Sequence, residues 1–165
     1  MSNVVKVRIG VPEDVDGMME LSLNACAENG LTDPNPRKLL EHIWPSLHQD
    51  HGIVGVIGPI GGKLEAAILL RTEPLWYSDK LSLVERAVFV DPEYRSAKGG
   101  RAGRLIEFAK TAAESLEIPL VIGILSSQRA SSKVKLYERH FGQPSGAYWL
   151  WHGTTGAWKD VEKTS

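Results

Sequence analysis

Short runs of apolar, largely β-branched residues alternate along the chain with longer stretches in which apolar residues recur every three or four positions. Runs of the first kind are typical of strands, and stretches of the second kind are typical of helices. The pattern predicts strands at residues 4–9, 52–59, 64–71, 81–90, 120–125 and 147–151. Helical spacing predicts helices that begin at Pro12 and Pro36 and helices that cover residues 98–117 and 131–140.

The order of these elements predicts a mixed α/β sheet with helices on its faces. A Gly-Gly turn joins the second and third predicted strands, which favours an antiparallel hairpin. Strand 81–90, helix 98–117 and strand 120–125 form one βαβ crossover. The two strands of that crossover should therefore run parallel.

The segment from residue 81 to residue 110 combines an apolar strand, a basic loop with glycines and an amphipathic helix. Glycine lets main-chain N–H groups approach a ligand closely, and a helix N-terminus adds unpaired donors and partial positive charge. Neither the Gly-Lys-Ser/Thr of a P-loop nor the G-x-G-x-x-G of a dinucleotide site occurs here. The segment predicts a phosphate-binding loop of another kind, and a solvated basic helix start is the alternative. Its cations are Arg95, Lys98, Arg101 and Arg104.

Length and charge narrow the class of protein. A chain of 165 residues predicts one domain, here residues 1–158, followed by a short tail at 159–165. The net charge of −1 argues against nucleic acid as a partner, because only the loop is locally basic. A single cysteine, Cys26, fits a reducing compartment. With no signal peptide and no apolar run of about 18 residues, we expect a cytoplasmic protein that does not cross a membrane.

The basic loop and its flanks resemble the acyl-CoA-binding motif of the GNAT N-acetyltransferase superfamily, where a strand and a helix flank Arg/Gln-x-x-Gly-x-Gly/Ala. DPEYR at 91–95 is typical of the sequence that leads into this loop, and LIEFA at 105–109 of the helix that leaves it. LYER at 136–139, followed by Phe141 and Gly142, resembles the second motif of the family. The resemblance implies a GNAT-like α/β (α+β) fold: a mixed, mostly antiparallel sheet of six to seven strands, about four helices, and splayed parallel central strands.

The resemblance also implies acetyl-CoA as co-substrate. Gly100 to Ala102 fill the Gly-x-Gly/Ala part of the motif, but its Arg/Gln position falls on Ala97, so Arg95 or Lys98 would supply the missing cation. The relaxed glycine pattern resembles that of some phage-associated members. The residues expected to hold acetyl-CoA are Val88, Phe89, Val90, Arg95, Lys98, Gly99, Gly100, Arg101, Ala102 and Gly103.

Glu85 is the candidate general base, because it interrupts an apolar strand just before the loop. Strict alternation predicts that it shares a strand face with Leu83, Ala87 and Phe89. A carboxylate among apolar neighbours has a raised pKa, which suits a base near neutral pH. Many superfamily members place a catalytic glutamate on this strand, often acting through water. An ion pair with a neighbouring cation is the alternative role.

Tyr137 is the candidate general acid, because the resemblance implies that the tyrosine of LYER protonates the CoA sulfur. A tyrosine packed at the boundary of helix and sheet is the alternative. A main-chain N–H around Phe89 or Val90 is expected to stabilise the oxyanion, and the strand from Val88 to Val90 is expected to pair with the pantetheine amides. Gly123 could mark the splay that admits this arm, or ordinary strand packing.

Other reactive or aromatic residues carry weaker signals. Cys26 occupies a core-facing helix position, which makes it a poor nucleophile. His48 and His51 are closely spaced but have no cysteine or acidic partner in a metal-binding pattern, so no metal is expected. Buried packing is expected for most of five aromatic residues, with an acceptor pocket or a dimer surface as the alternative: Trp44, Trp76, Tyr77, Trp149 and Trp151.

These features together predict an acetyl-CoA-dependent N-acetyltransferase that moves an acetyl group to a primary amine by direct attack in a ternary complex. Ala97 motivates the alternative of a GNAT-fold binding or regulatory protein with weak or no catalysis. The sequence leaves the amine acceptor open, with loop 72–80 as the expected specificity element. A homodimer is common among members of the superfamily and is a further expectation here.

Overall fold

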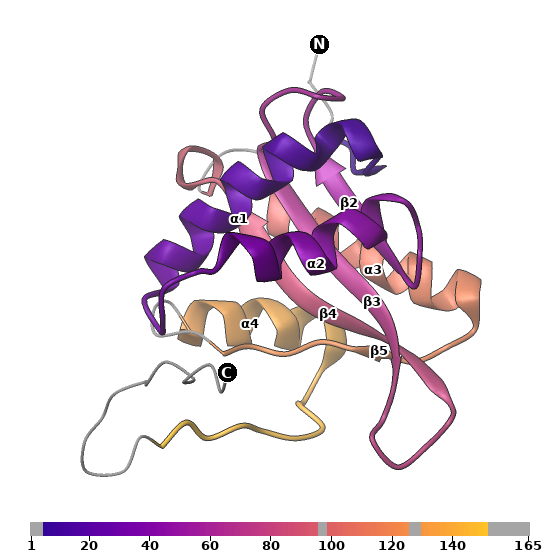
Figure 1. Cartoon of the computed structure of the whole chain (residues 1–165). Coiled ribbons are helices and arrows are strands. Elements are labelled where there is room, and N and C mark those ends of the chain that lie inside the picture. Colours follow the sequence, from indigo (N-terminus) through magenta and orange to yellow (C-terminus); the bar gives the residue numbers. More distant parts are fainter. Residues whose placement is uncertain (1–4, 96–98, 126–129, 152–165) are drawn as a thin grey trace, which may run out of the picture.

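Helices cover both faces of a five-stranded sheet in the computed structural model of the chain, which describes residues 5–95, 99–125 and 130–151 (Figure 1). The strands are β1 (Arg8–Ile9), β2 (Gly52–Ile57), β3 (Ala66–Pro74), β4 (Leu81–Val90) and β5 (Leu120–Val121), in that order across the sheet. The helices are α1 (Val15–Asn29), α2 (Pro36–Leu47), α3 (Arg101–Leu116) and α4 (Ala130–Phe141), with short 3-10 turns at η1 (Pro12–Asp14) and η2 (Pro92–Tyr94).

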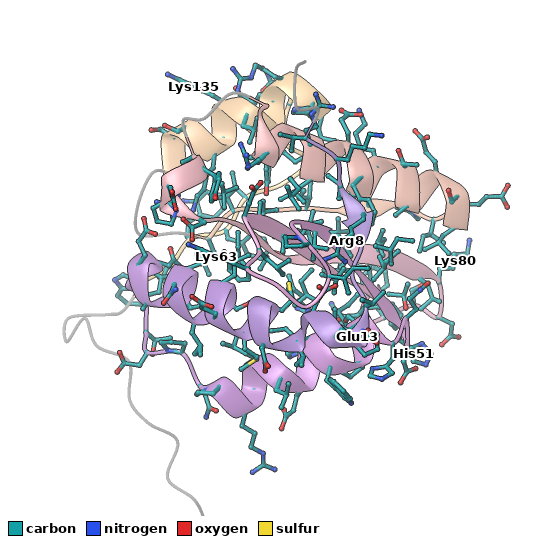
Figure 2. All side chains as sticks on the ribbon, turned by 90° about the horizontal axis from the view of Figure 1, so that it is seen from above. Arg8, Glu13, His51, Lys63, Lys80 and Lys135 are labelled. Atoms are coloured by element: carbon teal, nitrogen blue, oxygen red, sulfur yellow. The ribbon has the colours of Figure 1, made fainter. Side chains whose placement is uncertain are left out.

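The pairing of the strands confirms the predicted mixed sheet. Strands β1 to β4 pair antiparallel with their neighbours, and β4 pairs parallel with β5 through the α3 crossover. Figure 2 shows α1 and α2 on one side of the sheet and α3 and α4 on the other. None of the helices within the described ranges is long and apolar enough to cross a membrane.

Two apolar clusters form the core, one on each face of the sheet. One cluster packs α1 and α2 on the sheet through side chains that include Met18, Ile43 and Val54. The other packs α3 on the opposite face through side chains that include Leu83 and Leu105. Each fully buried side chain of this kind stabilises the fold by about 2 kcal/mol. The sheet is therefore a fixed platform for the residues at its edges.

An irregularity in the pairing of β3 with β4 interrupts the side-chain alternation of β4. Leu69 pairs with Ala87 and Leu70 pairs with Glu85, which leaves Arg86 as an extra residue. This is a β-bulge, which bends a strand and disrupts its ladder locally. The alternation of side chains between the two faces of the sheet therefore shifts by one residue at Arg86.

The bulge corrects the predicted environment of Glu85. Leu83 belongs to the cluster beneath α3, and Val88 packs against that same cluster, whereas Phe89 packs against the cluster beneath α1 and α2. The prediction that Glu85 shares a face with Ala87 and Phe89 is wrong, because the extra residue moves both of them to the opposite face. Glu85 keeps the face of Leu83 and points to the α3 side.

The C-terminal part of the predicted sheet is shorter than expected. β5 ends at Val121 instead of residue 125, because the chain diverges from β4 there and loses its ladder partner. Residues 147–151 form no strand, since no described strand lies in register with them. The sheet therefore has five strands within the described residues, instead of six or seven.

Several aromatic side chains lie on the surface, which corrects the expected buried packing. The hairpin between β3 and β4 extends beyond the helices that cover the sheet, and Trp76 and Tyr77 lie in that extension (Figure 1). Their rings contact each other edge to face with centroids 5.4 Å apart. The exposed fractions of the five aromatic residues are Trp44 46%, Trp76 94%, Tyr77 69%, Trp149 87% and Trp151 85%.

Candidate active site

The divergence of β4 from β5 opens one edge of β4. The two strands pair only at Leu83 with Leu120 and at Val84 with Val121. Further along, the N–H of Asp91 donates to the carbonyl of Glu65 at 2.8 Å, so that residue turns its main chain toward β3. Because successive residues of a strand turn their main-chain groups to opposite sides, Val90 and Val88 turn theirs toward the open edge.

Glu85 lies at the point of divergence, next to the bulge on β4. Its Oε2 accepts a hydrogen bond from the N–H of Gly123 at 3.4 Å, which spans the gap between the two separating segments. Burial raises the pKa of Glu85 to about 7, against the opposing effects of the Gly123 N–H and of the positive charges of Lys133 and Arg86. A carboxyl group with this pKa exchanges a proton near neutral pH, as a general base must.

Tyr137 faces the same space from α4. Burial, followed by the negative charge of Glu85, raises the pKa of the Tyr137 phenol. The phenol therefore keeps its proton at neutral pH, while Glu85 is half ionised near pH 7. The Tyr137 ring contacts Phe141 edge to face at 6.1 Å. A Cβ added at Gly123 would meet no atom of the described part of the chain within 4 Å, so those residues leave this part of the divergence open.

The described end of the predicted anion-binding loop, Gly99 and Gly100, leads into the N-terminus of α3. Gly99 and Gly100 have φ angles of 115° and 56°, a region that favours glycine. No side chain caps the helix, whose first intrahelical bond runs from the N–H of Arg104 to the carbonyl of Gly100. The preceding N–H groups of the first turn have no acceptor within the helix. Donors of this kind at a helix N-terminus are suited to an anion.

Two of the predicted cations are already engaged in ion pairs with carboxylates. Arg95 donates from both terminal nitrogens to the carboxylate of Glu28, and from Nε to the carbonyl of Val90 at 3.2 Å. Its pKa is raised first by the Glu28 hydrogen bonds. Arg101 pairs through Nε with Glu65 at 2.9 Å. These contacts join the loop to α1 and to the start of β3.

Arg104 and Lys98 are the two remaining predicted cations of the loop. Arg104 is exposed, and its Nε donates to the carbonyl of Gly99 at 3.1 Å. Lys98 lies outside the described residues, as does Ala97. The assignment of a phosphate to any of these side chains therefore stays a prediction, and the main-chain donors of α3 are the better-defined half of the loop.

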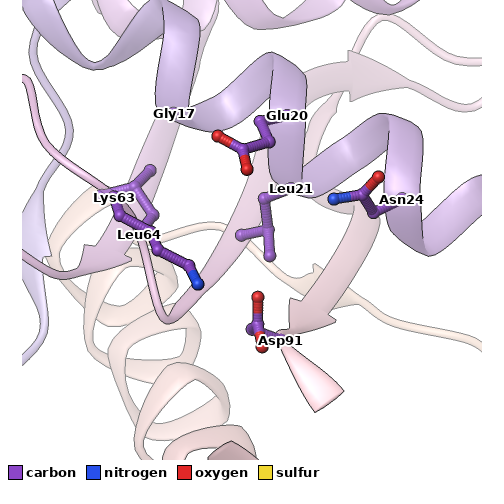
Figure 3. A pocket seen from close by; sticks show the side chains of 7 residues that line it. All are labelled: Gly17, Glu20, Leu21, Asn24, Lys63, Leu64 and Asp91. Carbon is purple, nitrogen blue, oxygen red and sulfur yellow. The ribbon is translucent and has the colours of Figure 1, made fainter. Parts of the chain in front are cut away.

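Other features contribute less to the chemistry. A small recess between α1 and the turn before β3 receives the side chains of Glu20, Lys63 and Asp91 (Figure 3). It lies on the α1 side, whereas Glu85 faces α3, so we assign it no part in proton transfer. Burial raises the pKa of the Cys26 thiol, which makes it a weaker nucleophile. The described residues contain no cluster of three or more metal-binding side chains.

Sequence reasoning missed the residues that attach α4 to α3. His140 Nδ1 lies 2.8 Å from Glu107 Oε1, and Lys110 Nζ donates to the carbonyl of His140 at 3.3 Å. Gly103, one of the residues expected to hold acetyl-CoA, faces the His140 ring, since a Cβ at Gly103 would lie 3.4 Å from His140 Nε2. The spacing of Gly103, Glu107 and Lys110, four and then three positions apart, was the available signal for a second contact face on this helix.

Gly99→Ala should destabilise the fold by about 2 kcal/mol. A Cβ at this position would lie 2.5 Å from Val5 Cγ2, at a φ angle that side chains rarely adopt. Gly100→Ala is the matched control, because its Cβ would meet no atom of the described residues within 4 Å, and the left-handed conformation costs about 1 kcal/mol. Urea unfolding of both variants measures the difference, and equal losses would contradict the described loop.

No model of a known protein family matches the sequence, and neither does any curated protein. Solved structures are similar, however. A possible acetyltransferase from Clostridium difficile 630 is 16% identical with a TM-score of 0.67, over 92% of this chain and 99% of that one. A ribosomal-protein-alanine N-acetyltransferase from Brucella melitensis biovar Abortus 2308 is 16% identical with a TM-score of 0.62, over 91% and 99%.

A third similar structure is an aminoglycoside acetyltransferase from an uncultured soil metagenomic sample, in complex with trehalose. It is 14% identical with a TM-score of 0.64, over 98% of this chain and 99% of that one. At these identities the similarity establishes the fold. The chain has the mixed α/β fold of the GNAT acetyltransferases, as the sequence predicted.

Proposed function

We propose that the protein is an acetyl-CoA-dependent N-acetyltransferase that acetylates a primary amine by direct attack in a ternary complex. The observation that carries this proposal is the pairing of Glu85 with Tyr137 at the divergence of β4 and β5. The negative charge of Glu85 acts on the Tyr137 phenol, and burial raises the pKa values of both groups, which leaves Glu85 available as a base and Tyr137 protonated. Two titratable groups with pKa values pushed apart in one site are typical of an acid and a base.

The remaining residues of the site have separate tasks. The main-chain N–H groups at the start of α3, around Gly100 to Gly103, would hold the pyrophosphate. The main chain of Val88 and the N–H of Val90 would pair with the pantetheine arm as an added strand would, while the Val90 carbonyl already accepts from Arg95. When bound, acetyl-CoA supplies the acyl carbon and a thiolate leaving group.

Proton movement then involves two side chains of this protein. Glu85, ionised above pH 7, accepts the proton that the attacking amine loses, directly or through a water molecule. Tyr137 Oη donates a proton toward the departing sulfur, and burial keeps that proton in place beforehand. The Val90 N–H, on the open edge of β4, is the main-chain candidate to stabilise the developing oxyanion.

Tyr137→Phe should lower kcat about 100-fold and change the Kd for acetyl-CoA by no more than about twofold. The variant removes one hydroxyl and keeps the ring that packs on Phe141. Thiol release with a panel of amines measures turnover and identifies the acceptor, and calorimetry measures acetyl-CoA binding. Tyr148→Phe is a suitable control, since that side chain is 82% exposed. Unchanged turnover in Tyr137→Phe would remove this residue from the mechanism.

A second candidate function is acetyl-CoA binding without efficient turnover. It is favoured by the engagement of Arg95 and Arg101 with Glu28 and Glu65, which leaves fewer cations for the phosphates. Calorimetry distinguishes the two functions when it is combined with the amine panel. Micromolar binding with thiol release supports the enzyme, binding without thiol release supports the alternative, and no binding at millimolar acetyl-CoA contradicts both.

The acceptor is a small amine, a peptide N-terminus or a protein lysine in this proposal. The similar structures include enzymes named for an aminoglycoside and for a ribosomal-protein alanine, and they span that range. The connection between β3 and β4, with Trp76 and Tyr77 exposed, precedes the strand of Glu85 and is the proposed specificity element.

A further inference from the structure

Helix α4 carries Tyr137 but has no buried side chain of its own. A helix without a buried face gains little from the hydrophobic effect, so specific contacts must hold it in place. Figure 2 shows α4 next to α3, on the same side of the sheet. The placement of the Tyr137 hydroxyl beside Glu85 therefore depends on what joins these two helices.

Two faces of helix α3 make contacts with the rest of the protein. Its apolar face is buried against the sheet and contains Leu105, Ile106, Ala109 and Ala113. A second stripe, formed by Gly103, Glu107 and Lys110, lies at helical spacing and faces α4. A solvent-facing stripe on a surface helix needs no such partners, so this stripe is a second docking face.

The contacts between the stripe and α4 are close and convergent. His140 Nδ1 lies 2.8 Å from Glu107 Oε1, and Lys110 Nζ donates to the His140 carbonyl at 3.3 Å. The Lys110 ammonium also lies 5.6 Å from the centroid of the Phe141 ring. A Cβ at Gly103 would be 3.4 Å from His140 Nε2, an ordinary contact distance, so the imidazole faces the backbone of Gly103 with room for about one methyl group between them.

We propose that Glu107, Lys110 and His140, which we call the α3–α4 clasp, position the Tyr137 hydroxyl for proton transfer. His140 and Phe141 lie one helical turn after Tyr137, and the Phe141 ring contacts the Tyr137 ring at 6.1 Å. Fixing the end of α4 therefore fixes the tyrosine. A displacement of about 1 Å in such a group is enough to lower a reaction rate strongly. The clasp residues are positioning residues, and this role rests on the proposed function of Tyr137.

The coupling between Tyr137 and Glu85 can be observed without turnover. The chain has four tyrosines, so uniform 3-fluorotyrosine labelling gives four fluorine resonances, and Tyr137→Phe assigns one of them. In the unmodified chain the Tyr137 resonance should shift with a midpoint near pH 7, as Glu85 ionises. Glu85→Gln should abolish that step and so assign it.

Three variants then test the clasp. Glu107→Gln and His140→Ala should each reduce the amplitude of the pH step at Tyr137 by at least about half and lower kcat about tenfold, with the KM for acetyl-CoA within about twofold. His140→Gln keeps a donor toward Glu107 and should restore most of the step. Glu114→Gln, on an exposed turn of the same helix, is the matched control and should change neither readout.

The outcomes separate this inference from the proposed function. A full pH step and unchanged amide exchange of α4 in both Glu107→Gln and His140→Ala would overturn the clasp, whatever the enzyme does. If the step is lost in these variants but Tyr137→Phe turns over normally, the clasp still positions α4, and only the acid role of Tyr137 fails. Loss of the step in Glu114→Gln as well would overturn the assignment to the clasp.

Discussion

Glu85→Gln should lower kcat/KM for the amine about 1,000-fold and remove the ascending limb of the pH profile. Only the ionised carboxylate accepts a proton, and burial raises the pKa of Glu85 to about 7. For the unmodified protein, kcat/KM should therefore rise tenfold per pH unit below pH 7 and level off above it. The amide of glutamine keeps the shape and cannot take up a proton at any pH in this range.

The same substitution should make the protein more stable at alkaline pH. The pKa of Glu85 is raised from 4.5 to about 7 on folding, so the folded state binds more protons than the unfolded chain in that interval. The free energy of unfolding contributed by this site falls as the pH rises from 4.5 to 7. Above pH 7 the ionised Glu85 costs up to about 3 kcal/mol, which glutamine removes.

Activity and stability are thus expected to move in opposite directions in one variant, which a merely structural residue would not produce. Urea unfolding at pH 5 and pH 8 measures the stability difference, and calorimetry should give a nearly unchanged affinity for acetyl-CoA. Glu93→Gln serves as a control, because its carboxylate is exposed and pairs only loosely with Lys63 at 3.8 Å. A persistent ascending limb in Glu85→Gln would exclude Glu85 as the base.

Local sequence signals predicted the elements that depend on local chemistry. The bounds of β4 match the prediction at both ends, because a run of ten mainly apolar residues lies between a polar turn and Asp91. α1 ends at Asn29, where a local signal is visible in the sequence: Gly30 adopts a left-handed φ of 69° and its N–H donates to the carbonyl of Cys26. Helix α3 begins at Arg101 instead of residue 98, after the two glycines with positive φ.

Features that depend on distant partners could not be read from the sequence. The bulge at Arg86 is defined by the register of β3, and simple alternation within β4 therefore gave the wrong face for Ala87 and Phe89. The ion pair of Arg95 with Glu28 joins residues 67 positions apart, so the loop cation looked available when it was not. The prediction of a strand at residues 147–151 was wrong for the same reason. A strand forms only where the edge of another strand is available to pair with it.

One member of the proposed catalytic pair could be identified from the sequence for a physical reason. Burial of a carboxylate in an apolar strand costs free energy, so such a residue is seldom found there without a function or a partner. Glu85 differs from its apolar neighbours in this respect. Tyr137 carried no such local signal and depended on the resemblance of LYER to a known motif. The contact of His140 with Glu107, which we propose positions Tyr137, joins two helices across a separation of 33 residues.

Asp14→Ala should destabilise the protein by about 3 to 5 kcal/mol, a large part of the total stability of a domain of this size. The Asp14 carboxylate is fully buried and accepts two hydrogen bonds from Arg8, at 2.8 Å and 2.9 Å. It also accepts from the N–H groups of Val11 at 2.9 Å and Gly61 at 3.1 Å. Removing it leaves the Arg8 charge and two main-chain donors without this acceptor.

The effect should depend on pH with a definite sign. Burial acts to raise the pKa of Asp14, but the hydrogen bonds from Arg8, Val11 and Gly61 outweigh it and hold that pKa below 3.8. A depressed pKa in the folded state stabilises the fold above the unfolded value and loses that contribution as the pH falls below it. The gap in stability between the unmodified protein and Asp14→Asn should therefore be widest near neutral pH and narrow in acid.

Urea unfolding of Asp14→Ala, Asp14→Asn and Glu41→Gln between pH 3 and pH 7 measures this contribution. Glu41 pairs with Arg37 at 3.4 Å, but both side chains are more than half exposed, so Glu41→Gln should cost no more than about 0.5 kcal/mol. A similar loss in Glu41→Gln and Asp14→Ala would contradict the argument. The Asp14 contacts join β1, η1 and the turn before β3, which lie on the α1 side of the sheet. The substitution should therefore lower the free energy of unfolding through contacts on that side. The pH response of Tyr137 to Glu85 should stay intact in the folded protein.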